Sequence, residues 1–248
     1  MLRRATREDK IAIERIVNDP ACRRHNAHDG ASSCDAAKYL EPPSFALIAG
    51  GGCFLFPAIG PSRYAVHTNF LPGHRGASAL AAACEALCYV FVCTDAEELH
   101  TMVPGNNPAA TWFTRKMAFR PRFTRDGAWR QGGADHAMTY YSLHVDDWII
   151  QGHAAEIGRG FHRDLAQSVP LTHRDDPVHD AYAGAAAAMV CAGQALKGIS
   201  IYNRWARLAG YVPAVVLSEK PLRIDIRDCV LRHDGGPSFS VEAPCQSH

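Results

Sequence analysis

The sequence lacks several features that would mark a specialised class of protein. Its formal net charge is +1 over 248 residues, so the overall composition gives no direct signal for nucleic acid or an acidic membrane as a partner. It contains no internal repeat and no low-complexity linker. The hydrophobic fraction of 47% and the charged fraction of 21% are instead typical of a soluble globular protein.

Long apolar runs are also missing. The most apolar stretch, residues 181–196, is rich in alanine and is interrupted by Gln194. It is shorter than the roughly 20 residues that a membrane-spanning helix requires. The N-terminal residues have no apolar run after their arginines, so they do not resemble a signal peptide. We therefore expect a cytoplasmic protein without a membrane segment.

Metal-binding motifs are absent as well. The nine cysteines include no CxxC pair, and Cys84 and Cys88 have no histidine or third cysteine at ligand spacing. We interpret the cysteines as small side chains in a reducing compartment. The thirteen histidines raise the question of a metal site, but no pair has the i, i+4 spacing of a helical metal motif. We expect no metal, although four residues offer suitable groups: His173, Asp175, His179 and Asp180.

One stretch combines an alternating strand pattern, a glycine turn and a long helix. Residues 64–71 alternate as a strand, and an alanine-rich helix is predicted over 77–92. The first turn of a helix leaves backbone N–H groups unpaired and carries partial positive charge. Gly76 lets a ligand approach the backbone closely, and Arg75 adds a full charge. The stretch therefore predicts an anion site, with an ordinary strand–helix turn as the alternative.

The order of elements before and after this stretch predicts an α/β (α+β) fold, in which helices flank a mixed central sheet. Thr6 and Asp9 form a capping-box pattern at the start of a helix, which Asp19-Pro20 ends. Residues 21–43 are predicted to be irregular, with a short helix near 34–39. Strands are predicted over 2–5, 44–49, 53–57, 63–71, 99–104, 119–124 and 137–145, and a further helix over 109–117.

A second part begins near residue 148. We predict a helix over 148–168 and a long helix from Asp176 to Gly210, kinked at Gly193 or Gly198. The small residues of 181–188 would permit close helix–helix contact. Short strands are predicted over 211–218, 222–227, 229–232 and 238–241. We therefore predict two domains, residues 1–147 and a C-terminal α+β module, residues 148–248, of two helices and short strands.

Two segments of the first part resemble motifs of the GNAT superfamily of N-acyltransferases. In that family a strand ends in a Val-x-Pro-like turn, followed by Arg/Gln-x-x-Gly-x-Gly/Ala at a helix start. Here Phe70-Leu-Pro precedes Arg75-Gly-Ala-Ser-Ala-Leu80. The downstream family motif, Asn-x-x-Ala followed by Gly-Phe, is similar to the segment 107–119 of this chain. The resemblance implies a GNAT-like fold over about residues 1–147.

The same resemblance implies acetyl-CoA, or another acyl-CoA, as cosubstrate. The cosubstrate would lie where strands 64–71 and 99–104 separate, with backbone N–H groups of the following helix start holding its pyrophosphate. An amine would then attack the thioester directly after a base removes its proton. The implied cosubstrate-binding residues are Phe70, Arg75, Gly76, Ala77, Ser78, Ala79 and Asn107. For Asn107 the alternative is a simple helix cap.

Several residues depart from the family pattern. Ser78 stands where the pattern has its central glycine, and Thr114 stands where many members have the tyrosine that serves as acid. The strand before the turn carries no carboxylate, so His67, with an ordinary pKa of about 6.5, is the candidate base. Alternation places His67 on the same face as Asn69, and a structural sheet histidine is the alternative. Tyr141 is the candidate acid.

Two functions follow from these motifs. The first is an acetyl-CoA-dependent N-acetyltransferase acting on an unidentified amine, with residues 148–248 shaping substrate choice or forming a homo-oligomer. The second is a catalytically inactive GNAT-like scaffold, which the missing glycine, tyrosine and carboxylate favour. The combination of a degenerate GNAT-like part and a C-terminal extension is similar to proteins encoded by tailed phages. That similarity implies a virion component of the internal head or tail, bound to other phage particle proteins.

Overall fold

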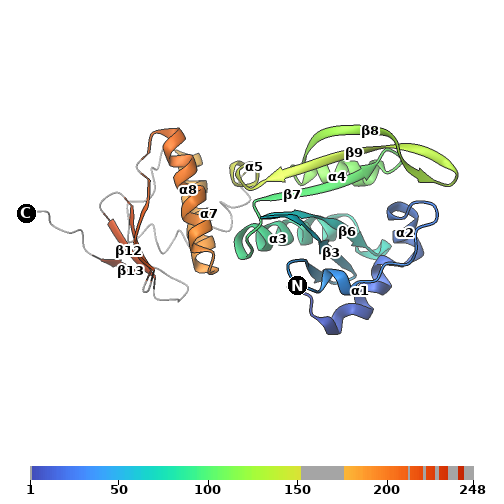
Figure 1. Ribbon diagram of the computed structural model, residues 1–248, viewed down its shortest axis with the longest axis horizontal. Coiled ribbons are helices and arrows are strands. Elements are labelled where there is room, and N and C mark those ends of the chain that lie inside the picture. The colour runs from blue at the N-terminus through green and yellow to red at the C-terminus, as the bar shows by residue number, and fades with distance from the viewer. Residues whose placement is uncertain are drawn as a thin grey trace, which may run out of the picture. The chain divides into compact units, whose positions relative to one another are not determined.

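The computed structural model describes residues 2–151, 176–211, 213–219, 222–226, 229–233 and 240–242. The chain divides into two compact units, shown in Figure 1. The first contains residues 1–87 and 96–145, and the second contains residues 88–95 and 146–248. Among the described residues, no helix is both long enough and apolar enough to cross a membrane.

The first unit contains two sheets. One has the strand order β1-β2-β3-β6 and the other β4-β5-β7-β9-β8. Strands β5 and β7 run parallel, and the other recorded pairs run antiparallel, so the mixed sheet that we predicted is confirmed. The strands are β1 (Arg3–Arg4), β2 (Phe45–Ala49), β3 (Gly52–Phe56), β4 (Ala58–Gly60), β5 (Arg63–Ala65), β6 (His67–Phe70), β7 (Glu98–Pro104), β8 (Arg120–Gln131) and β9 (Ala134–His144).

The predicted single strand over 63–71 is divided between the two sheets. Strand β5 pairs with β7, whereas β6 pairs with β3. Val66 lies between them and is the point at which the chain leaves one sheet for the other. The alternating pattern is the same on both sides of Val66, so the sequence gives no sign of this division.

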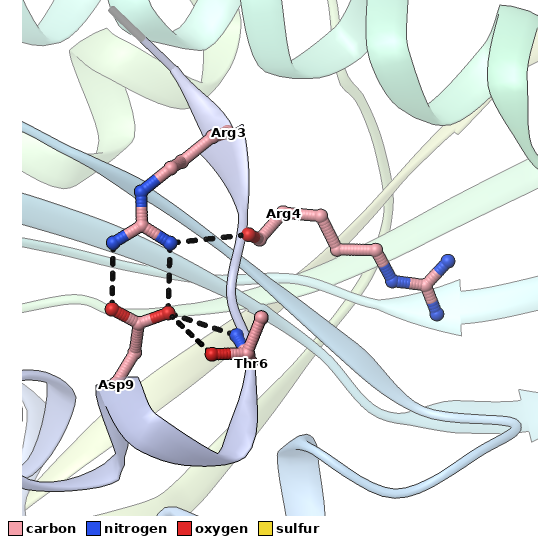
Figure 2. A network of polar contacts seen from close by, with 4 residues as sticks. All are labelled: Arg3, Arg4, Thr6 and Asp9. Carbon is pink, nitrogen blue, oxygen red and sulfur yellow. Dashed lines mark hydrogen bonds and ion pairs between the residues drawn. The ribbon is translucent and has the colours of Figure 1, made fainter.

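The predicted capping box at the N-terminus is present (Figure 2). The Asp9 carboxylate accepts a hydrogen bond from the Thr6 backbone N–H at 2.8 Å and forms a two-pronged ion pair with Arg3 at 2.6 and 2.8 Å. The hydrogen bonds from Arg3 and then from Thr6 hold the pKa of Asp9 well below its usual range. The 3-10 turn η1 (Arg7–Asp9) thereby leads into α1 (Lys10–Val17), whose Ile13 is fully buried.

Helix α2 (Pro20–Asn26) lies in a segment that we predicted to be irregular, so that part of the prediction is wrong. Asp19 caps this helix by accepting a hydrogen bond from the Ala21 N–H at 2.8 Å, and proline occupies its first position. Proline has no N–H to leave unpaired there, so Asp-Pro is also a start signal. Asp19-Pro20 therefore ends α1 and begins α2. A short turn, η2 (Ala37–Tyr39), lies within the predicted 34–39 helix.

Helices α3 (Ala77–Cys93) and α4 (Pro108–Lys116) agree with the predicted ranges to within one residue. Helix α3 turns a buried stripe inward at helical spacing: Ala79, Ala83, Ala86, Leu87, Val90 and Phe91. The β8–β9 hairpin is much longer than predicted. Its strands continue to a two-residue turn, Gly132-Gly133, in which both glycines have positive φ.

In the second unit, α7 (Pro177–Cys191) and α8 (Ala195–Ala209) lie side by side (Figure 1). The predicted long helix is broken at Gly193, whose φ is +82°, and α8 ends at left-handed Gly210. The predicted close helix contact is confirmed. A Cβ added at Gly198 of α8 would lie 2.8 Å from the carbonyl oxygen of Ala186 in α7.

An antiparallel sheet completes the described part of the second unit. Its strands follow chain order: β10 (Val215–Glu219), β11 (Leu222–Ile226), β12 (Cys229–His233) and β13 (Ser240–Glu242). Helix α5 (Val145–Ile150) overlaps the start of the predicted helix over 148–168. The rest of that helix and the predicted break at 170–173 lie outside the described residues. The α+β character of the C-terminal module is confirmed.

Candidate acyl-donor site

Strands β6 and β7 separate at Val66. The Val66 N–H donates to the His100 carbonyl oxygen at 2.7 Å, and the Thr101 hydroxyl donates to the Val66 carbonyl oxygen at 3.0 Å. Beyond this point, the described part of the chain pairs β6 with β3 and β7 with β9. The separation that the motifs implied is therefore present, and the Thr101 side chain marks where it begins.

The separation leaves one backbone edge of β6 without a partner strand in the described part of the chain. The Leu71 N–H donates to the Gly51 carbonyl oxygen at 3.0 Å, which makes this a hydrogen-bonded pair of the β6–β3 ladder. Because bonded and non-bonded pairs alternate along antiparallel strands, the peptide groups of Thr68 and Phe70 point away from β3. They lie on the edge that bonds to β7 at Val66. An extended ligand with amide groups could pair with this edge.

The turn after β6 presents further backbone donors. The 3-10 turn η3 (Pro72–His74) leads through Arg75 to Gly76, whose φ of +73° favours glycine. The first bond within α3 runs from the Leu80 N–H to the Gly76 carbonyl oxygen at 3.1 Å. Residues 77–79 precede that bond, so their N–H groups have no acceptor within the helix. The side chains of Ala77 and Ser78 are exposed and that of Ala79 is buried, so Ser78 does not fill the turn.

Arg75 has a second role that the sequence did not indicate. Its Nε donates to the Phe70 carbonyl oxygen at 2.9 Å, and its Nη2 donates to the Ala21 carbonyl oxygen at 3.0 Å. The guanidinium thus ties α2 to the end of β6 while remaining exposed. The Cys22 thiol also donates to the Phe70 carbonyl oxygen, at 3.4 Å, and burial raises the pKa of this thiol.

The three-glycine turn between β2 and β3 contacts the end of β6 and the turn that follows it. A Cβ added at Gly52 would lie 2.2 Å from the ring of Phe70, which is 7% exposed. A Cβ added at Gly51 would lie 2.1 Å from the ring of His74. At Gly50 nothing lies within 4 Å. The hairpin prediction was correct, but two of its glycines make room for the rings of Phe70, at the end of β6, and of His74 in the following turn.

His67, the candidate base, lies on β6 on the same face as its partner Leu55. The side chain reaches solvent although many protein atoms surround it, and its ring lies edge-on to Tyr39, with ring centroids 6.4 Å apart. Desolvation by surrounding atoms, and then the charge of Lys38, lowers the pKa of His67. The lowered pKa favours the neutral imidazole, the form that can accept a proton. Asn69 shares this face, as predicted, and is buried.

The other candidates lie on the β7–β9 side. Tyr141 stands opposite Thr101 in the β7–β9 ladder and is 3% exposed. Asn107 accepts a hydrogen bond from the Ala110 N–H at 3.0 Å, which confirms its prediction as a helix cap. Thr114 is buried in α4. Tyr141 lies on β9 and His67 on β6, and a shared catalytic role for them stays a prediction.

A polar strap that the sequence did not reveal joins residues 27–31 to residues 129–133. The Asp29 carboxylate accepts hydrogen bonds from the N–H groups of Gly132 and Gly133, both at 2.9 Å. These two bonds, the one from Gly133 first, lower the pKa of Asp29. The His28 and Trp129 rings also meet edge to face, with ring centroids 5.8 Å apart. The sequence marks Gly132-Gly133 as a turn but does not identify its partner 100 residues away.

This polar strap bridges the two separated strands. On the β6 side, Asn26 donates to the Asn69 side-chain oxygen at 2.6 Å. On the β7 side, Asn106 donates to Gln131 at 2.9 Å, and Gln131 donates to the Ala27 carbonyl oxygen at 2.7 Å. A chain of hydrogen bonds thus connects β6 to the residues that follow β7.

The residues considered for a metal do not gather in the described part of the chain, where no group of three His, Cys, Asp or Glu side chains could hold an ion. His173 and Asp175 lie outside the described residues. His179 is 1% exposed and packs against three aromatic rings: Tyr202, Trp205 and Tyr211.

Comparison with known proteins places this geometry in a fold family. No protein-family model matches the sequence, and no curated protein matches it. The structure is similar to spermidine N-acetyltransferase from Vibrio cholerae in complex with CoA and spermine. The TM-score is 0.52 at 16% identity, over 60% of this chain and 97% of that one. It is also similar to ribosomal-protein-alanine N-acetyltransferase from Brucella melitensis. That TM-score is 0.51 at 16% identity, over 58% of this chain and 99% of that one.

Both matches cover nearly the whole of the other chain, so the likeness is to a complete domain. At this level of identity it defines the fold. The chain contains a GNAT fold, as its two motifs predicted.

Proposed function

We propose that the protein is an acyl-CoA-dependent N-acyltransferase that transfers an acetyl group from acetyl-CoA to an amine. The observation that carries the proposal is the separation of β6 from β7 beside the first turn of α3. It leaves the Thr68 peptide group and the Phe70 N–H on the edge of β6 that turns away from β3, near the first N–H groups of α3, while Arg75 and Cys22 hold the Phe70 carbonyl oxygen. Acetyl-CoA carries amide groups at one end and a pyrophosphate at the other. The amides match the edge of β6, and the pyrophosphate matches the start of α3, which follows β6 in the chain.

In this proposal the pantetheine amides of the donor pair with the open edge of β6. The pyrophosphate accepts hydrogen bonds from the backbone of residues 76–79 at the start of α3, where the helix dipole favours negative charge. The exposed Ser78 hydroxyl can donate one more hydrogen bond. Arg75 holds the turn through Phe70 and Ala21 and contributes charge nearby.

The chemistry would be direct transfer. The neutral amine attacks the thioester carbonyl, a C–N bond forms, the C–S bond breaks, and the released thiolate takes up a proton. Neutral His67 is the group on β6 that could accept the amine proton, directly or through water. A backbone N–H on the open edge would stabilise the oxyanion. Tyr141 as the acid stays a prediction.

The names of the matched enzymes suggest which class of amine acceptor to examine first. Of the two matched enzymes, one is named for spermidine and is bound to spermine, and the other is named for a ribosomal-protein alanine. A primary amine on a polyamine or at a peptide N-terminus is therefore the first class to examine. We assign donor binding to residues 1–147 and an accessory role to residues 148–248.

A catalytically inactive scaffold is the second candidate. It is favoured by the lack of a carboxylate on β6 and by Arg75, whose Nε and Nη2 already donate to protein carbonyls. Neither matched structure reported above is a phage or virion protein, so a virion role is not part of the proposal.

Calorimetric titration with acetyl-CoA separates the two candidates. The enzyme proposal predicts a Kd of about 100 μM or tighter, roughly −5.5 kcal/mol. The double variant Arg75→Ala/Ser78→Trp should lose this binding, whereas Arg15→Ala, an exposed change on α1, should keep it. Absence of binding to acetyl-CoA, CoA and longer acyl-CoAs would refute the proposal.

Release of the CoA thiol in the presence of polyamines or peptides then tests catalysis. A His67→Ala variant should lower turnover most strongly in the pH range where the wild-type imidazole is neutral. Unchanged turnover from pH 6 to 9 would exclude His67 as the base.

A further inference from the structure

The end of helix α4 and the outer strand β8 of the five-stranded sheet together carry a concentration of positive charge, with two cations on α4 and four on β8. Residues 115–130 contain six arginine or lysine residues and one aspartate, a formal charge of +5, whereas the whole chain carries +1. The rest of the chain is therefore net negative. In β8, most side chains are exposed along the whole strand. Composition alone hides this asymmetry.

The pairing register places much of this charge on one face. Tyr140 of β9 stands opposite both Met102 of β7 and Phe123 of β8, so these three side chains share a face. The flanking β9 residues on that face, Met138 and Ser142, stand opposite Arg125 and Arg120, and Arg122 Nε donates to the Ser142 hydroxyl at 2.6 Å. We call this set the arginine–aromatic face: Met102, Arg120, Arg122, Phe123, Arg125 and Tyr140.

The apolar members of the arginine–aromatic face are not part of the core. Phe123 is 55% exposed and Met102 is 47% exposed. The Phe123 ring stacks on Tyr140 with centroids 4.4 Å apart and planes 17° apart. The opposite face of the same strands carries the core residues Leu99 and Leu143, both fully buried. The arginine–aromatic face therefore offers exposed aromatic surface beside arginines at Phe123 and Met102, although Met138 and Ser142 on the same face are buried.

The edge of β8 is unsuited to pairing with another strand. It contains Pro121, which lacks a backbone donor, and two irregularities of register, between 121 and 123 and between 125 and 129. Proline, bulges and charged side chains are the features that protect edge strands from strand addition. A second copy of this chain would also bring the same positive charge. A partner must therefore contact the face and must be acidic.

We infer that the arginine–aromatic face binds single-stranded nucleic acid without sequence specificity. Guanidinium groups pair with phosphate oxygens, and the exposed Phe123 ring supplies a platform for an unpaired base. A duplex hides the faces of its bases, and an acidic peptide has no need of an aromatic platform. This inference uses no residue of the acyl-donor site and is independent of the proposed function.

Fluorescence anisotropy with a labelled oligo-dT or oligo-rU tests the inference on the full chain. We expect saturable binding at low salt and a fall in log K of about 2 per tenfold rise in salt, as for three phosphates on a single strand. The Phe123→Leu variant keeps an apolar side chain but removes the ring, and should weaken binding about fivefold or more. Thermal unfolding would establish that the variant is folded.

A matched pair of variants separates the arginine–aromatic face from general charge. Arg122→Gln/Arg125→Gln should weaken binding about tenfold or more, whereas Arg15→Gln/Arg24→Gln removes the same charge from exposed helical positions of the same unit and should have little effect. Equal losses in the two double variants would overturn the inference. So would absence of binding at low salt, or equal competition by poly-glutamate, which would indicate a surface for acidic proteins. Acetyl-CoA binding should be unchanged in all these variants.

Discussion

The α3 turn and the tip of the β8–β9 hairpin both rely on glycine, but for different reasons. Beside the α3 turn, in the β2–β3 hairpin, Gly52 is needed because the buried Phe70 ring occupies the space where a Cβ would lie. At the hairpin tip, Gly132 and Gly133 have nothing within 4 Å, so only their positive φ favours glycine, and their backbone N–H groups donate to Asp29. One end of the site is held by packing and the other by polar contacts.

This difference predicts how each end responds to change. The packed end should be sensitive to volume and less sensitive to charge, because its buried contact is the apolar Phe70 ring on Gly52. The polar end should tolerate volume and respond to charge. Glycine in a sequence therefore has at least two structural meanings, and the residue it contacts decides between them.

The largest expected effect is from Gly52→Ala. The added methyl would meet the buried Phe70 ring, so we expect a loss of about 1–3 kcal/mol of stability. Chemical denaturation measures this loss. Gly50→Ala, at the other end of the same turn, is the control and should change stability by less than about 0.5 kcal/mol. Equal effects would show that the turn, and not the Phe70 contact, requires glycine.

The next effect compares glycines with positive φ at the two ends. Gly76→Ala and Gly133→Ala should each cost about 1–2 kcal/mol, because alanine is strained in the left-handed region. Gly73→Ala, in open space and without a positive φ, should be nearly neutral. Only Gly76→Ala should also weaken acetyl-CoA binding, as calorimetry would show. If Gly133→Ala weakened acetyl-CoA binding equally, the hairpin tip and the α3 turn would not act independently in donor binding.

The smallest effect concerns the Asp29 contacts. The folded-state pKa of Asp29 is lowered, so its stabilising bonds are complete above the ordinary aspartate value of about 3.9 and are lost as pH falls through the lower folded value. The amide chemical shifts of Gly132 and Gly133 should report this transition. In Asp29→Asn they should stay constant with pH. A wild-type midpoint at or above 3.9 would contradict the assigned hydrogen bonds.

Much of the fold was predictable from local patterns. The capping box, helices α3 and α4, the glycine hairpin and the two GNAT motifs all depend on residues close in sequence. The features that were missed depend on partners far along the chain. The division at Val66 depends on which strands pair with β5 and β6. The polar strap depends on the contact of Asp29 with residues 132–133. The tie made by Arg75 depends on the Ala21 carbonyl oxygen, which lies in a helix that was not predicted.

The candidate site shows the same limit. Motif residues identified the α3 turn, and the cap role of Asn107 was foreseen. Which N–H groups of β6 turn away from β3 depends on the pairing register of the two strands. That register cannot be read from a single sequence. His67 and Tyr141 were chosen by residue type, and their positions place them on different strands without a contact between them.

Residue-resolved amide hydrogen exchange with and without CoA tests the central claim most directly. If the donor pairs with the open edge of β6, saturating CoA should slow exchange at Thr68, Phe70 and residues 76–79. The Leu71 amide, already bonded to Gly51, should show little change. Unchanged exchange at Thr68 and Phe70 in CoA-saturated protein, or protection confined to the second unit, would contradict the proposal that the separated strands bind the acyl donor.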